Sequence, residues 1–177
     1  MIPNTILDML ILAGFILAAY FLFFKKRNRH ERKKSSAKRI IKVVNGLTHP
    51  GQKIAYLRKT DPYAFEELIL TLLQRKGFVI ARNKRYSGDG GIDGKFVFNG
   101  KTWLIQAKRY SSRIRIEHVV AFARILDEHK CNGIFVHTGL TPVSVVNYVK
   151  SMKQIRLEII SGEKLLSLFD SEKKGTF

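Results

Sequence analysis

The feature that most limits how this chain folds is a two-residue turn signal, Asn99-Gly100, between two runs of alternating character. Asn-Gly favours the tight turn of a β-hairpin, so the flanking runs, 95–98 and 102–110, are predicted to be paired antiparallel strands. Side chains two residues apart share one face of a strand. One face of the second strand therefore comprises Leu104, Gln106 and Lys108. The other face, predicted to lie toward a core, comprises Trp103, Ile105 and Ala107.

An acid at the mouth of the first strand completes a polar group on this hairpin. Asp93 precedes the run 95–98, so strand pairing brings its carboxylate toward the amide of Gln106 and the ammonium of Lys108. A carboxylate binds a hard divalent cation, and an ammonium orients water or stabilises the charge of a developing phosphorane. The alternative interpretation is a surface hairpin with a glycine-rich turn and scattered charge.

Two blocks of this stretch resemble the catalytic motif of the Mrr-like restriction endonucleases, a branch of the PD-(D/E)xK nuclease superfamily. The blocks are Asp-Gly-Gly-Ile-Asp-Gly at 89–94 and Gln-Ala-Lys-Arg-Tyr at 106–110. The usual superfamily pattern has a second acid where this chain has Gln106, and the Mrr-like branch carries glutamine there. The resemblance implies an α/β, restriction-endonuclease-like fold with a mixed β-sheet flanked by helices, and it implies nuclease activity.

The clearest predicted helix spans 61–77 and precedes the motif. Asp61 is a good N-cap and Gly77 suits the C-terminal stop. Its apolar stripe comprises Phe65, Leu68, Ile69, Leu72 and Leu73. At about 100° per residue, Glu66 falls on the border of that stripe and Glu67 falls on the far side, which is predicted to face water.

Glu66 is the candidate helix carboxylate of the site. A border position lets an acid lean into a cleft beside the core, and the Mrr-like family carries a helical Phe-Glu pair that Phe65-Glu66 matches. The alternative is an ordinary surface acid near a helix start, where the helix dipole favours negative charge.

Predicted helices and strands alternate along the rest of the chain. Their order from residue 61 is α-β-β-β-α-β-α-β-α, which indicates a mixed sheet with helices on its faces. This succession is similar to the Mrr-like catalytic domain and covers 63–169. The folded domain is predicted to span 52–177.

The N-terminal stretch 6–24 is almost continuously apolar and is followed at once by a basic cluster. Its length and flanks predict one transmembrane helix within 1–24, and 25–51 is predicted to be a basic juxtamembrane linker. The positive-inside rule places the N-terminus outside and the C-terminal domain in the cytoplasm, as a single-pass protein of the inner membrane. The alternative is a buried or partner-binding helix of a soluble protein.

The charge balance favours a polyanionic partner. The net charge is +18, from 32 Lys and Arg against 14 Asp and Glu, and an excess of +11 remains outside the N-terminal stretch and the basic cluster. DNA and an anionic membrane surface both fit this excess.

The single cysteine, Cys131, excludes an intrachain disulfide and a cysteine metal cluster, and it fits a reducing compartment.

We therefore predict a membrane-anchored DNA endonuclease that uses Mg²⁺ or Mn²⁺. Asp93 and the backbone carbonyl of Ala107 would bind the cation with help from Glu66, Lys108 would position the attacking water, and Gln106 would orient water or a phosphate oxygen. The alternatives are a non-catalytic, membrane-associated DNA-binding adaptor and a junction-resolving nuclease of the same superfamily. Cutting both strands commonly needs two copies, so a homodimer is a further expectation that the sequence does not address.

Several residues around the motif are candidates for secondary roles. Arg109, Lys84 and Arg85 are predicted to contact DNA phosphates, with a salt bridge as the alternative for Arg109. Asp89 either braces the glycine-rich turn or acts as a secondary ligand. His137, near a strand end, is the one histidine proposed as a phosphate contact, and a packed side chain is its alternative.

Overall fold

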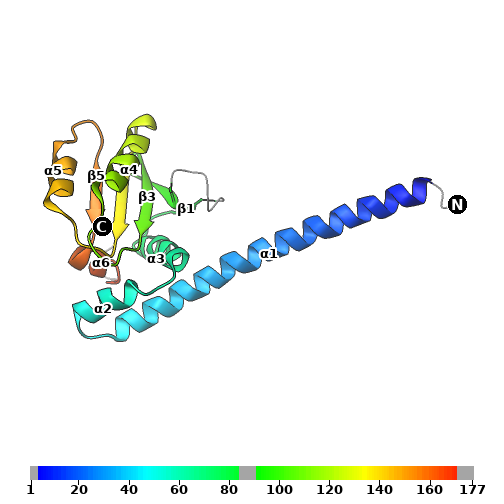
Figure 1. Ribbon diagram of the computed structural model, residues 1–177, viewed down its shortest axis with the longest axis horizontal. Coiled ribbons are helices and arrows are strands. Elements are labelled where there is room, and N and C mark those ends of the chain that lie inside the picture. Colours follow the sequence, from blue (N-terminus) through cyan, green and yellow to red (C-terminus); the bar gives the residue numbers. More distant parts are fainter. Residues whose placement is uncertain (1–3, 84–90, 171–177) are drawn as a thin grey trace.

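A five-stranded mixed β-sheet forms the centre of the fold. The structure is a computed structural model that describes residues 4–83 and 91–170. The strands lie side by side in the order of the sequence (Figure 1), and their bounds are β1 Ala81–Arg82, β2 Gly94–Phe98, β3 Lys101–Lys108, β4 Asn132–His137 and β5 Leu157–Ile160. The first three strands pair antiparallel, and β3, β4 and β5 pair parallel. The predicted mixed sheet is confirmed.

Helices cover both faces of the sheet. Their bounds are α1 Asn4–Gly46, α2 Pro50–Leu57, α3 Pro62–Arg75, α4 Ile116–Glu128, α5 Val143–Ser151 and α6 Gly162–Ser167. One core contains buried residues of α1, α2, α3 and α6, and the second contains those of α4 and α5 (Figure 1). The two faces of β3 thus enter different cores, with Ile105 in the first and Leu104 in the second.

The predicted hairpin turn is confirmed by its backbone angles. Asn99 and Gly100 have φ of 51° and 71°, both in the left-handed region that a tight hairpin turn requires. The turn fixes the register in which Phe98 faces Lys101 and Gly94 faces Ile105. This register places the residues just before β2 beside the C-terminal end of β3, where the candidate site lies.

The predicted start and end of α3 are also confirmed. The Asp61 side chain accepts a hydrogen bond from the backbone N–H of Ala64 at 3.0 Å, which is the N-cap interaction. Gly77, with φ of 97°, ends the helix. Both ends are set by short-range interactions, so the sequence pattern was sufficient to locate them.

Glu67 does not face water as the helix pattern predicts. Its side chain is 4% exposed, and its Oε1 accepts a hydrogen bond from Nε of Arg82 at 2.8 Å. Arg82 lies on β1 and also donates to Gln74 of the same helix at 3.1 Å. The ion pair between Glu67 and Arg82 therefore holds the short edge strand β1 against α3.

Replacing Glu67 by alanine is expected to lower the free energy of unfolding by about 2–3 kcal/mol, because Arg82 is left largely buried without its carboxylate. Thermal or urea unfolding measures this change. Asp127→Ala is the matched control, since its partner Lys130 lies in a surface ion pair at 3.3 Å with both side chains more than half exposed. Equal stability of the Glu67 and Asp127 variants would contradict the structural role of the pair.

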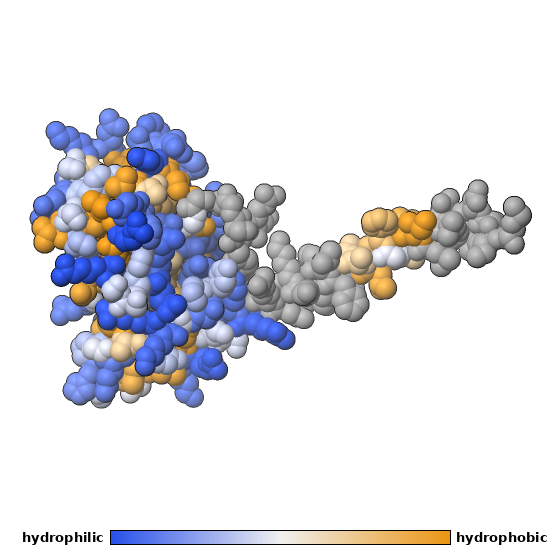
Figure 2. Space-filling view, in the orientation of Figure 1, coloured by the Kyte–Doolittle hydropathy of each residue, from blue (hydrophilic) through white to orange (hydrophobic). Residues whose placement is uncertain are grey.

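Helix α1 differs from the predicted division into an anchor, a linker and a domain that begins at 52. It is one helix of 43 residues, and its apolar part up to Tyr20 projects away from the domain with its described side chains exposed (Figures 1 and 2). Its last turns contribute buried residues to the first core, namely Ala37, Ile40, Ile41 and Val44. The helix continues because nothing in 25–46 breaks it, and the apolar face of these last turns packs on α3. The packed domain therefore begins before residue 37.

The transmembrane helix predicted within 1–24 is not supported. Among the residues that the structure describes, no helix is both long and apolar enough to cross a membrane.

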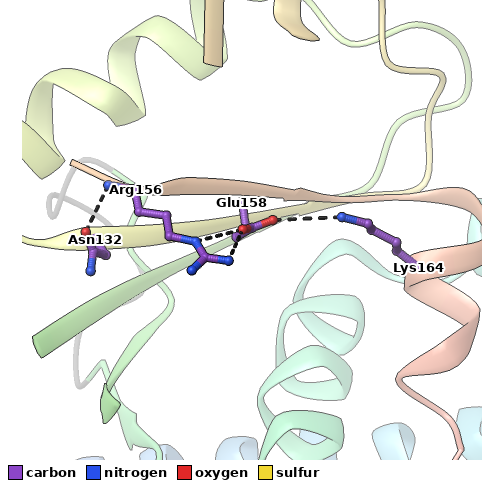
Figure 3. A network of polar contacts seen from close by, with 4 residues as sticks. All are labelled: Asn132, Arg156, Glu158 and Lys164. Carbon is purple, nitrogen blue, oxygen red and sulfur yellow. Dashed lines mark hydrogen bonds and ion pairs between the residues drawn. The ribbon is translucent and has the colours of Figure 1, made fainter. Parts of the chain in front are cut away.

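A polar network joins β5 to its neighbours at the end of the sheet opposite Lys108. Glu158 on β5 lies between Arg156 and Lys164, with closest contacts of 2.7 and 3.8 Å (Figure 3). The backbone N–H of Arg156 donates to Oδ1 of Asn132 at 2.9 Å. Asn132 pairs in register with Trp103 near the start of β3. This network therefore ties the strands together without contributing to the candidate site.

Candidate active site

Asp93 is fixed in place by the hairpin that follows it. Its backbone N–H donates to the carbonyl of Ile105 at 2.8 Å, and its Oδ2 accepts from the backbone N–H of Ala107 at 2.7 Å. Its carbonyl accepts from the backbone N–H of Asn83 at 3.0 Å. The carboxylate therefore lies beside the last residues of β3, and its second oxygen, Oδ1, takes no part in these three hydrogen bonds.

Gln106 and Lys108 face the loop that carries Asp93. Nε2 of Gln106 donates to the carbonyl of Gly91 at 2.9 Å, and the Gln106 side chain is 3% exposed. A Cβ added at Gly91 would collide with that amide and would lie 3.9 Å from Nζ of Lys108. Gly91 also has φ of 82°, a backbone conformation that favours glycine. The Gln106 side chain thus holds the loop that contains Gly91 and Asp93, and the Lys108 ammonium lies beside this loop.

The environments of the two candidate carboxylates raise the pKa of both. Burial and, to a smaller extent, the negative charge of Glu66 together raise the pKa of Asp93 to about 7, against the opposing effects of the Ala107 N–H and Lys108. Burial likewise raises the pKa of Glu66, while Lys33 and Lys108 lower it. Glu66 of α3 and Lys108 at the end of β3 therefore both act on Asp93 in the loop before β2, and the shared role of these three residues in one site stays a prediction.

The pair of acids fits a hard cation. Two negatively charged carboxylates that are partly buried and near each other raise the free energy of the folded state. A divalent cation bound between them offsets both their repulsion and the cost of removing them from water. The described part of the chain holds no group of three or more His, Cys, Asp or Glu side chains suited to a metal. Further ligands would therefore come from backbone carbonyls such as that of Ala107, from water or from substrate oxygens.

The raised pKa of Asp93 predicts how stability changes with pH. In the folded state Asp93 retains its proton up to about pH 7, whereas an unfolded aspartate loses it near the ordinary pKa of 3.8. Stability in the absence of metal therefore falls as pH rises between these values and stays low above pH 7.

Asp93→Asn removes this penalty and is expected to raise the free energy of unfolding by about 2–4 kcal/mol at pH 8 in a chelating buffer. At pH 4 the two proteins should have nearly equal stability. Urea unfolding at the two pH values measures the difference. A stability gain that is the same at both pH values would contradict the assignment.

The residues predicted to contact phosphate differ in their exposure to solvent. Arg109 is exposed and donates from Nη1 to the carbonyl of Arg58, whose Nε donates to the carbonyl of Thr138 at 2.9 Å. His137 is fully buried, its Nε2 lies 3.1 Å from Oγ1 of Thr141, and burial lowers its pKa to about 4. It is therefore a packed neutral residue with no exposed surface to offer a phosphate. Lys84, Arg85 and Asp89 lie outside the described residues.

Sequence reasoning missed two cationic residues near the site. Arg58 follows α2 and reaches the end of β4, a long-range contact that no local pattern signals. Lys33 lies in the basic run and acts on Glu66. A signal for Lys33 was present, because it falls in phase with Ala37, Ile40 and Val44 at helical spacing.

The comparison with known families agrees with this geometry. A family model described as restriction endonuclease (Mrr_cat) matches residues 57–169, which is more than half of the chain. The matched segment contains α3 to α6 and β1 to β5, and α1 lies outside it. No curated protein and no solved structure matches the chain.

Proposed function

Because the chain belongs to the Mrr_cat restriction endonuclease family, we propose that it is a DNA endonuclease that depends on Mg²⁺ or Mn²⁺. The observation that carries this proposal is that the charges of Glu66 and Lys108 both act on the carboxylate of Asp93, which is hydrogen-bonded to the end of β3. An acid and an ammonium at the end of a hairpin, with a second acid on α3, provide the groups that phosphodiester hydrolysis needs.

The proposed roles follow from where each side chain lies. Asp93 and Glu66 hold the cation, and the carbonyl of Ala107 is a third ligand on the same strand end. Lys108 positions the attacking water and offsets the negative charge that develops on the phosphate. When bound, the cation supplies Lewis-acid activation of the phosphate and lowers the pKa of a water. Gln106 keeps the loop of Gly91 and Asp93 in place through its hydrogen bond.

DNA is the proposed substrate because the chain carries a large excess of positive charge, +18 in total. Arg109 is exposed next to Lys108 and is proposed to contact the phosphate backbone, together with Lys84 and Arg85, which precede β2 in the sequence. Such contacts position the DNA without reading its sequence.

Nicking of supercoiled plasmid by the purified full-length chain tests this function. We expect relaxed and linear products with Mg²⁺ or Mn²⁺ and none with a chelator. Single-stranded and branched DNA are included, so that a junction-resolving activity is detected as preferential cleavage of the branched form. Binding to all three DNAs without cleavage of any would replace the nuclease by a DNA-binding adaptor.

The cellular location is a separate proposal that rests on the sequence. We propose that the apolar segment 6–24 attaches the protein to the inner membrane, with the nuclease domain in the cytoplasm. The full-length chain should stay in the membrane fraction after a high-salt wash, and a chain that begins at Lys25 should be released. Release of the full-length chain by salt would contradict this location.

A further inference from the structure

We propose that Lys33, on the helix outside the matched catalytic segment, is a positioning residue that holds the Glu66 side chain in its working orientation. This inference rests on the proposed nuclease function and extends it, because it makes α1 part of the active site. Three observations support it: the phase of α1, the contact of Lys33 with α3, and the charges around Glu66.

Lys33 lies on the face of α1 that packs against the rest of the domain. Residues at i, i+4, i+7 and i+11 lie on one face of a helix, and the residues in phase with Lys33 are Ala37, Ile40 and Val44. All three are at most 4% exposed and belong to the first core. Lys33 itself is half-buried, whereas Lys38 and Lys42 of the same helix are exposed. The packing of α1 against α3 therefore also places Lys33 beside α3.

The ammonium of Lys33 lies over the aromatic ring of Tyr63 on α3. Its Nζ lies 4.2 Å from the centroid of the Tyr63 ring, within the range of a cation–π interaction. Tyr63 precedes Glu66 by three residues on α3, so the two side chains lie on adjacent turns of the same helix face. The ring thus fixes the ammonium near the Glu66 carboxylate, at the edge of the site.

The charges around Glu66 agree with this placement. Among the neighbouring charges, Lys33 has the largest effect on the pKa of Glu66, greater than that of Lys108, and both lower it. Asp61 acts in the opposite direction. Glu66 is half-buried and has a long side chain, so without a partner it would populate several rotamers. An ammonium held by a ring favours the rotamers that lie toward it.

The loss of this restraint should slow the chemical step more than it weakens DNA binding. Misplacement of a reacting group by about 1 Å costs about 100-fold in rate, so we expect Lys33→Met to lower kcat by about 10- to 100-fold with little change in KM for DNA. Lys33→Arg keeps the charge and the contact with the ring, and it should retain most of the activity. Tyr63→Leu should share part of the defect of Lys33→Met, and Tyr63→Phe, which keeps the ring, should not.

The test uses single-turnover and steady-state cleavage of plasmid by the full-length chain and these variants. Lys42→Met is the matched control, because it removes the same charge from an exposed position on the same helix. Melting temperatures and DNA affinities in a chelating buffer are measured alongside, and we expect Lys33→Met to match Lys42→Met in both.

The outcomes distinguish this inference from the proposed function. An active wild type with an equally active Lys33→Met would overturn the positioning role and leave the nuclease intact. A variant with raised KM and unchanged kcat would also overturn it, by making Lys33 a phosphate contact. A defect that Lys33→Arg does not rescue, or that comes with a lower melting temperature, would make the role one of stability. A wild type without cleavage would remove the nuclease and this inference together.

Discussion

Asp93→Asn is expected to abolish cleavage while DNA binding survives or becomes tighter. The carboxylate supplies the negative charge that holds the cation, and an amide binds divalent cations far less strongly. Loss of one positioned catalytic group commonly costs about 10²–10⁴ in rate. The fold should be preserved, because the amide oxygen of asparagine can still accept the hydrogen bond that Ala107 donates to Asp93. Plasmid nicking time courses and fluorescence anisotropy with labelled DNA measure the two effects.

Asp127→Asn is the control for this change. It also neutralises one acid, but Asp127 lies on the surface and pairs with Lys130. Its cleavage rate should equal that of the wild type. If Asp93→Asn cleaved DNA as fast as Asp127→Asn, Asp93 would have no catalytic role.

Lys108→Met is expected to cause the second largest loss, about 10²-fold or more in cleavage rate. Its ammonium lies beside Gly91 and lowers the pKa of both Asp93 and Glu66. Methionine keeps the length of the side chain and removes the charge that would orient water and stabilise the phosphate. DNA affinity should fall slightly.

Lys101→Met separates a local effect from a loss of net charge. Lys101 is exposed at the other end of β3, seven residues away and therefore about 23 Å along the strand. Its removal should weaken DNA binding at most slightly and leave the cleavage rate unchanged. Equal losses of rate in the two lysine variants would show that only the total positive charge matters.

Features fixed by neighbours in the sequence could be predicted well. The turn at Asn99-Gly100 and the cap at Asp61 depend on a few adjacent residues, and both are present as expected. The register of the hairpin then follows from the turn, and it places Asp93 beside Ala107. Glu66 raises the pKa of Asp93, and its role as the helix carboxylate of the site stays a prediction.

Features that depend on distant contacts could not be predicted in the same way. The helix pattern places Glu67 opposite the apolar stripe, but it carries no information about β1, whose Arg82 covers that carboxylate. The basic composition of 25–39 indicates a solvated segment and hides the buried face that begins with Ala37. The second difference arises because α1 packs against α3, a contact between segments that are distant in the sequence.

A change of metal preference tests most directly whether Asp93 binds the catalytic cation. Asp93→Cys replaces a hard carboxylate by a softer thiolate, which binds Mg²⁺ poorly and soft cations such as Cd²⁺ well. In single-turnover plasmid cleavage, we predict that the wild type is active with Mg²⁺ and inactive with a chelator. We predict that the cysteine variant is inactive with Mg²⁺ and regains cleavage when Cd²⁺ is added. Wild-type cleavage that persists in a chelator, or a cysteine variant that cleaves equally well with Mg²⁺, would contradict this account.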